Sequence, residues 1–276
     1  MRNSKNCKRR PWASSGRFEV SRSDAHTQIA QWLTTAQRAV VFTGAGISTE
    51  SGLPDFRSPG GIWATSTPVQ YQDFLASADA RYEYWRQKAI AHRDFLLGAP
   101  NVGHRILAEW QQRGWIRALI TQNIDEYHQE AGSSDVVELH GTARRIACLD
   151  CAMRFDANAL TERFLKSDVV PDCPACGGLL KHATISFGQM LDRETLWKAT
   201  KFSQEADLYL ALGSSLVVHP AASLPQLAQQ RGARLVIINR EETPLDDIAQ
   251  IVLREPLGEA LTAIDSAARK QSEGKH

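Results

Sequence analysis

The fold class is indicated by one segment of the chain, Ala39-Val40-Val41-Phe42-Thr43-Gly44-Ala45-Gly46-Ile47-Ser48. A run of β-forming residues leads into two glycines, which let a turn approach a phosphate at a helix N-terminus. The fingerprint of a hydride-transfer enzyme requires a third glycine, where Thr49 stands, and an acid about twenty residues later. A polar and aromatic cluster, residues 52–58, follows instead. The pattern disfavours a plain dehydrogenase, and a purely structural glycine turn is the other interpretation.

Similar apolar runs recur along the chain, separated by amphipathic stretches of helix length. The expected strands are residues 39–43, 118–121, 136–139, 208–212, 235–239 and 251–253. Asn101 is the expected N-cap of a helix that ends near Gly114. The alternation of strands and helices predicts an α/β fold with a Rossmann-like, doubly wound parallel sheet covered on both faces.

Four cysteines fall in two pairs, Cys148-x-x-Cys151 and Cys173-x-x-Cys176. Each pair turns the backbone so that both sulfurs face the same way, and two pairs converge on one tetrahedral ion. The spacing predicts a zinc site. Two disulfides are the alternative. They are disfavoured because the fifth cysteine, Cys7, lies in a charged tail and no apolar secretory stretch precedes the fold.

Two segments are expected to interrupt the sheet. Residues 54–100 predict a helical insertion belonging to a small domain, and residues 143–188 predict a zinc-binding module. The Rossmann-like domain is then expected at residues 25–53, 101–142 and 189–270, with tails at 1–24 and 271–276.

The composition disfavours two classes of partner. A net charge of +1 over 276 residues gives no reason to expect nucleic acid or an anionic membrane surface, and no apolar run is long enough to span a bilayer. Residues 1–22 carry seven Lys and Arg against one acid, Glu19, which predicts a disordered tail. We expect a cytoplasmic protein, with a mitochondrial address as the alternative if this tail is a transit peptide.

Polar side chains follow two of the expected strands, in Thr121-Gln122-Asn123-Ile124-Asp125 and Leu139-His140-Gly141. Open α/β sheets bind ligands at the carboxyl ends of their strands. Asn123 and Asp125 are therefore candidates for hydrogen bonds to an amide or a ribose, or else they cap a helix. His140 is a candidate general base near neutral pH, or else a polar residue satisfied by its neighbours.

Taken in order, these segments resemble the sirtuin family of NAD-dependent protein-lysine deacylases. The likeness runs from the Gly44 turn through the Asn123, His140 and cysteine motifs to Gly213-Ser214-Ser215-Leu216 and Asn239, and covers about residues 25–270. It implies a transferase that moves the acyl group from lysine to ADP-ribose and releases nicotinamide from NAD. A protein mono-ADP-ribosyltransferase or an NAD hydrolase on the same fold is the alternative, as is a non-catalytic zinc module.

The resemblance implies catalytic roles for His140, Asn123 and Asp125, with His140 taking a proton from a ribose hydroxyl. It also implies NAD, as co-substrate, in contact with Gly44, Ala45, Gly46, Ile47, Asp55, Phe56, Arg57, Gln122, Asn123, Ile124, Asp125, Gly213, Ser214, Ser215, Asn239, Arg240, Glu241 and Leu257. The partners would be acyl-lysine proteins, each lying as an added strand against Phe187, Gly188, Gln189, Leu216, Val217 and Val218. One zinc per chain on Cys148, Cys151, Cys173 and Cys176 would be structural.

A further likeness, to the class II branch, rests on Arg57-Ser58, Gly61 and Ser77-Ala78-x-x-Arg81-x-x-Tyr84-Trp85. The Tyr-x-x-Arg pair that reads acidic acyl groups in class III is missing, although Arg81 and Arg86 are nearby cations. Two departures from the family are Gly213-Ser214-Ser215 in place of Gly-Thr-Ser and Phe187-Gly188-Gln189 in place of Phe-Gly-Glu. The second leaves the preference for substrate side chains open.

Overall fold

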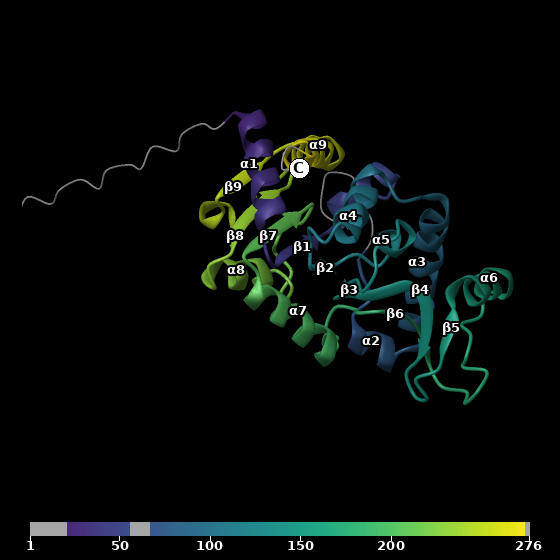
Figure 1. Ribbon diagram of the computed structural model, residues 1–276. Coiled ribbons are helices and arrows are strands. Elements are labelled where there is room, and N and C mark those ends of the chain that lie inside the picture. Colours follow the sequence, from purple (N-terminus) through teal and green to yellow (C-terminus); the bar gives the residue numbers. More distant parts are fainter. Residues whose placement is uncertain (1–20, 56–66, 274–276) are drawn as a thin grey trace, which may run out of the picture.

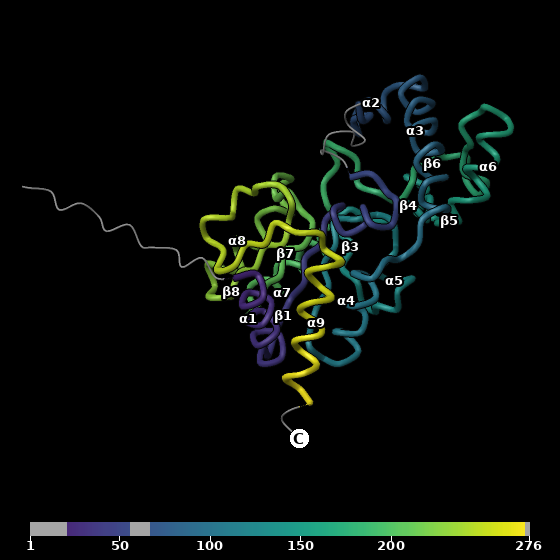
Figure 2. The backbone as a smooth tube through the Cα atoms, turned by 90° about the horizontal axis from the view of Figure 1, so that it is seen from above, coloured from purple at the N-terminus to yellow at the C-terminus, as the bar shows by residue number. Residues whose placement is uncertain are grey.

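The computed structural model describes residues 21–55 and 67–273 in two lobes (Figures 1 and 2). Residues 1–20 of the predicted basic tail and the predicted site residues Phe56 and Arg57 lie outside the described residues, as do Ser58 and Gly61. The last residues of the predicted tail are helical instead, because Ser21 caps a helix that begins at Arg22.

The larger lobe is built on a parallel sheet of six strands in the order β3-β2-β1-β7-β8-β9. These strands are β1 (Ala39–Thr43), β2 (Ala118–Thr121), β3 (Val137–Glu138), β7 (Leu208–Leu212), β8 (Arg234–Ile238) and β9 (Ile251–Leu253). The chain fills one half of the sheet outward from β1, then crosses back and fills the other half outward from β7. The expected Rossmann-like sheet is confirmed, and its strand order reverses between β1 and β7, where such sheets bind ligands.

Helices cover both faces of this sheet, because successive strand residues point to opposite sides. Val41 and Leu210 pack under α1 (Arg22–Thr35), α4 (Val102–Gln112) and α9 (Leu257–Glu273). Phe42 and Tyr209 face the opposite core, under α7 (Arg193–Glu205) and α8 (Ser223–Gln230). Asn101 caps α4 as predicted, since its side chain accepts hydrogen bonds from the backbone N–H groups of Gly103 and His104.

The smaller lobe joins α2 (Tyr71–Ala76) and α3 (Ala78–Leu97) to a three-stranded antiparallel sheet. This sheet has the order β5-β4-β6, with β4 (Gly141–Cys148), β5 (Arg154–Asp156) and β6 (Leu180–Thr184), and carries α6 (Ala157–Ser167). Trp85 of α3 is fully buried, packs on Phe164 of α6 and donates its indole N–H to the Leu180 carbonyl at 3.1 Å. The helical insertion and the sheet that carries the cysteines therefore share one hydrophobic core.

Shorter elements connect these parts: the 3₁₀ helices η1 (Ala45–Ser51) and η3 (Asp246–Ile248), and α5 (Tyr127–Glu130). Across the described ranges, no helix combines the length and apolar character needed to cross a membrane.

Candidate functional site

Two glycine turns interlock where the strand order reverses. The Gly44 N–H donates to the Leu212 carbonyl at 3.0 Å, and the Gly46 N–H donates to the Gly213 carbonyl at 2.9 Å. A Cβ added to Gly44 or to Gly46 would come within 2.7 Å of backbone atoms of Gly213. The predicted turn after β1 thus packs backbone to backbone on the turn after β7, which leaves its outer side open to a ligand.

A small hollow of about 60 Å³ opens beside this junction. Its lining residues are Gly46, Thr49, Glu50, Asp55, Gly213, Asn239, Arg240, Glu241, Glu255 and Leu257. Seven of these ten were expected to contact NAD. They come from the ends of β1, β7 and β8, from the segment after η1 and from the start of α9. Thr49, Glu50 and Glu255 were missed; only the adjacency of Thr49 and Glu50 to the glycine motif could have signalled them. A hollow at the switch point lies where doubly wound sheets bind ligands, which makes it a candidate for part of the dinucleotide site.

Ser48 lies between two of the predicted site residues. Its hydroxyl donates to Asp125 Oδ2 at 2.7 Å and accepts from Asn123 Nδ2 at 3.1 Å. Asp125 also accepts the Tyr127 backbone N–H at 3.0 Å. Burial raises the pKa of Asp125, while the bond from Ser48 opposes the rise. Asn123 and Asp125, predicted from the end of β2, are thereby brought together, and Ser48 was missed as their link.

The His140 ring is held by one nitrogen. Nδ1 lies 2.9 Å from the Gln122 carbonyl, which can only accept, so Nδ1 carries the proton and Nε2 keeps its lone pair. Burial lowers the pKa of His140, and the bond to Gln122 acts against this. Gln122 in turn donates from its side chain to Ser214 Oγ at 2.7 Å, which ties the end of β2 to the turn after β7. A neutral imidazole with a free Nε2 is suited to accept a proton.

A second polar layer, absent from the sequence predictions, lies behind these residues. Thr43 Oγ1 donates to Thr121 Oγ1 at 2.8 Å and lies 2.9 Å from Nε2 of His128. His104 packs against His128 with ring centroids 4.9 Å apart and the ring planes tilted by 57°. Burial lowers the pKa of His104 to about 4 and that of His128 well below its usual range. Both rings are therefore neutral near pH 7 and serve as hydrogen-bonding core.

The four paired cysteines meet in one cluster. Their Sγ atoms all lie within 4.8 Å of one another, with Cys148 and Cys176 at 3.5 Å and Cys151 and Cys173 at 3.8 Å. A disulfide would need about 2.05 Å, whereas a tetrahedral ion with Zn–S bonds of about 2.3 Å sets its sulfurs roughly 3.8 Å apart. The thiolates fit zinc, as the spacing predicted.

The predicted peptide-binding segments lie on two loops. Residues 185–189 follow the end of β6 as a turn, closed by the Gln189 N–H on the Ser186 carbonyl at 3.0 Å. The Gln189 side-chain carbonyl accepts the Ser186 N–H in return, at 3.1 Å. Phe187 and Val217 are partly exposed, at 40% and 46%, so apolar side chains border this surface. The segment that was expected as a pairing strand is a loop in the free chain.

Known proteins match both the sequence and the fold. The Sir2 family model matches residues 44–220. An NAD-dependent protein deacetylase of Rhodopseudomonas palustris is 46% identical over 243 residues, which is 87% of this chain and 96% of that protein. NAD-dependent protein deacetylase 1 of Bradyrhizobium diazoefficiens is 46% identical over 85% of this chain and 92% of its own. A solved structure of Sir2 with a p53 peptide and NAD⁺ aligns with a TM-score of 0.79 at 36% identity, covering 90% of this chain and 98% of that one. The chain belongs to the Sir2 family.

Proposed function

We propose that this chain is an NAD-dependent protein-lysine deacylase of the class II type, acting as a transferase from acyl-lysine to ADP-ribose. The observation that carries the proposal is His140, whose Nδ1 is fixed on the Gln122 carbonyl and whose Nε2 is free, at the carboxyl edge of the sheet. Membership of the Sir2 family and the names of the bacterial relatives support it.

The NAD-binding residues follow from the hollow and the polar network beside it. The turns that contain Gly44, Gly46, Gly213 and Ser214 would lie against the phosphates, because glycine lets the backbone approach them closely. Asn239, Arg240, Glu241 and Leu257 would border the adenosine half, and Asp55, Ile47, Asn123 and Asp125 the nicotinamide half. Bound there, NAD would supply a ribose whose anomeric carbon takes the acyl oxygen in exchange for nicotinamide.

The chain's own contribution is chiefly position, because an amide oxygen is a weak nucleophile and must be held in line. Ser48 fixes the Asn123 amide and the Asp125 carboxylate relative to each other. His140 Nε2 takes a proton from a ribose hydroxyl so that this hydroxyl captures the acyl group. Zinc, about one per chain on the four cysteines, supplies no step and holds the small lobe together.

The protein substrate would pair with the loops around Phe187–Gln189 and Leu216–Val218 through main-chain hydrogen bonds, which makes sequence selectivity weak. The four thiolates must stay reduced to hold zinc, which supports a cytoplasmic location. The near-neutral net charge supports protein, and not nucleic acid or membrane, as the partner.

Mass analysis of all products from NAD and an acetyl-lysine peptide tests the function. We expect nicotinamide, free-lysine peptide and acetyl-ADP-ribose in equal amounts. NAD loss without deacylated peptide would indicate ADP-ribosyl transfer or hydrolysis, and no NAD loss at all would indicate a binding module.

A further inference from the structure

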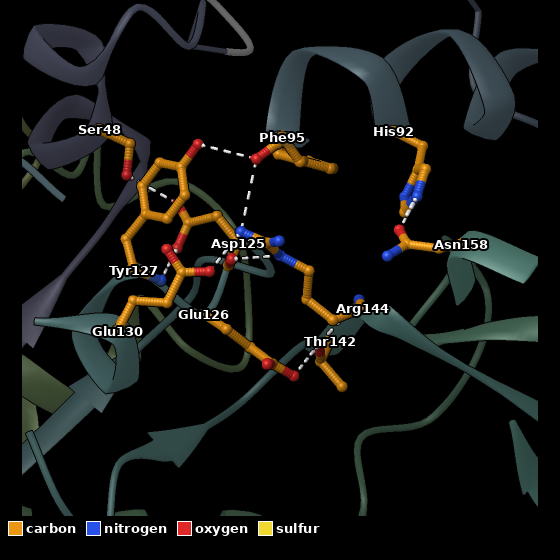
Figure 3. Close-up of polar contacts among 10 residues, drawn as sticks. All are labelled: Ser48, His92, Phe95, Asp125, Glu126, Tyr127, Glu130, Thr142, Arg144 and Asn158. Carbon is orange, nitrogen blue, oxygen red and sulfur yellow. Dashed lines mark hydrogen bonds and ion pairs between the residues drawn. The ribbon is translucent and has the colours of Figure 1, made fainter. Parts of the chain in front are cut away.

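Three consecutive residues at the start of β4 hold three consecutive residues of the loop after β2. The Ala143 N–H donates to the Ile124 carbonyl at 2.9 Å, and Arg144 Nε donates to the Asp125 carbonyl at 3.0 Å. The Thr142 hydroxyl donates to Glu126 Oε1 at 2.5 Å. Figure 3 shows Arg144 reaching from its strand to the backbone of Asp125. Strand β4 therefore holds the loop of the proposed NAD site at its first residues and ends at a predicted zinc ligand, Cys148.

The clamped loop needs support. Glu126, next to Asp125, has φ 62° and ψ 16°, a left-handed conformation that a residue with a side chain adopts at a cost. Asp125 is only 4% exposed, so its carboxyl group is held where solvation is poor. The positive charge of Arg144 acts against the burial that raises the pKa of Asp125.

Arg144 is itself anchored from three sides. Its Nη2 donates to Glu130 Oε1 of α5 at 2.7 Å and to the Phe95 carbonyl at the end of α3 at 3.4 Å. The guanidinium lies over the Tyr127 ring, 5.8 Å from its centroid, and the Tyr127 hydroxyl also donates to the Phe95 carbonyl, at 3.2 Å. A planar guanidinium donates in these directions at once, which an ammonium group cannot do.

We propose that Arg144 is a positioning residue for the reaction, which fixes Asp125 against Ser48 and Asn123 and couples the small lobe to NAD binding. The proposal rests on the proposed function, in which Asp125 contacts NAD. Because Arg144 acts through Asp125, its loss should weaken the use of NAD and leave the use of the acyl peptide nearly unchanged.

The test compares Arg144→Met and Arg144→Lys with Arg145→Met, all as full-length zinc-loaded protein. Arg145 is the matched control, since it is the next residue on the same strand, is 53% exposed and pairs only loosely with Asp156, at 3.9 Å. For Arg144→Met we expect KM for NAD to rise about tenfold or more, because the variant loses several hydrogen bonds from a charged donor. KM for the peptide should stay within about twofold of the wild-type value. Arg144→Lys should recover part of the loss and Arg145→Met should match the wild type.

Equal NAD kinetics in Arg144→Met and Arg145→Met, at matched zinc content and Tm, would overturn the proposal. If Arg144→Met does not fold, Glu130→Ala decides, because it removes the carboxylate that accepts from Nη2 and alters a side chain that is already 41% exposed. A KM for NAD raised about two- to fivefold supports the proposal, and an unchanged KM overturns it. The wild type is assayed in parallel: an inactive wild type would reject the proposed function itself, whereas an active one confines the failure to Arg144.

Discussion

Replacing Gly213 by Ala probes the contact between the two glycine turns on which the proposed NAD site is built. Gly213 has φ 62°, and a Cβ there would meet the Ile47 nitrogen at 2.6 Å, the Gly46 carbonyl carbon at 2.8 Å and Leu257 Cδ1 at 2.8 Å. Two of these three atoms are backbone, so the turn after β1 must move. Gly114 is the matched control, since its φ is 72° and a Cβ there would meet nothing within 4 Å.

The two substitutions share the backbone cost and differ in the collision. A left-handed alanine costs about 1–2 kcal/mol, and the stiffer unfolded chain offsets about 0.4–1 kcal/mol of this. We therefore expect Gly114→Ala to lower the free energy of unfolding by about 1 kcal/mol. The collision at Gly213 adds about 1–3 kcal/mol, as for overpacked cores, which gives a total of roughly 2–4 kcal/mol.

Urea unfolding of both variants with zinc present measures this difference, and steady-state kinetics measure KM for NAD. We expect Gly213→Ala to be the less stable variant and to raise KM for NAD, while Gly114→Ala keeps the wild-type KM. If Gly213→Ala is as stable as Gly114→Ala and uses NAD normally, the two glycine turns do not interlock as described.

Three further predictions concern the zinc site, acid stability and the acyl group. Cys173→Ser should lose zinc and have a lower Tm, with a smaller effect on kcat, because zinc binding contributes to the free energy of folding. Metal analysis and thermal unfolding check this, and a variant that is metal-free, stable and active would refute it. In the folded protein the pKa of His182 is lowered well below its usual range by burial and by the nearby Lys88, His92 and Lys181. The unfolded chain therefore binds a proton at His182 at a higher pH than the folded chain does, so the free energy of unfolding falls as the pH drops below about 6.5. In His182→Phe the free energy of unfolding should fall less steeply between about pH 7.5 and about pH 5.5, by up to roughly 1.4 kcal/mol per pH unit. The same pH dependence in the variant and the wild type would contradict this. Acetyl-lysine, or a longer neutral acyl-lysine, should give a higher kcat/KM than succinyl-lysine in the same peptide. The two nearby cations are already occupied, since Arg86 pairs with Glu83 and Arg81 donates to the carbonyls of Phe74 and Leu75. A higher kcat/KM for succinyl-lysine would show that Arg81 or Arg86 binds the acyl carboxylate.

The sequence predicted the large sheet well because its strands are continuous apolar runs buried on both faces. The runs at 39–43, 118–121, 208–212 and 251–253 are strands at those bounds. Two others are displaced: residues 136–139 shorten to β3 (Val137–Glu138), and 235–239 shift to β8 (Arg234–Ile238). These are strand ends, where backbone pairing and not composition decides the last residue.

The zinc module was predicted from ligand spacing alone, and its sheet was not. Strand β4 contains Arg144 and Arg145, whose charge hides the strand pattern, and it pairs with β6 through a register shift between Gly141 and Ile146. A strand stabilised by a metal and by long-range pairing carries little local signal.

The polar network of the site escaped prediction for a related reason. Ser48 and Asp125 are 77 residues apart in the chain, and Arg144 and Asp125 are 19 apart. Each is an ordinary polar residue in its own stretch of sequence. Motifs locate the strand ends that carry a site, but only the folded chain brings their side chains into contact.

The role of His140 is tested by two rates measured on His140→Ala with NAD, an acetyl-lysine peptide and isotopically labelled nicotinamide. His140 is proposed to act after nicotinamide has left, so the variant should still incorporate label into NAD in the presence of the peptide while deacylation falls roughly a hundredfold or more. Zinc content and Tm should equal those of the wild type. Near-normal deacylation by a folded, zinc-loaded His140→Ala would contradict the account.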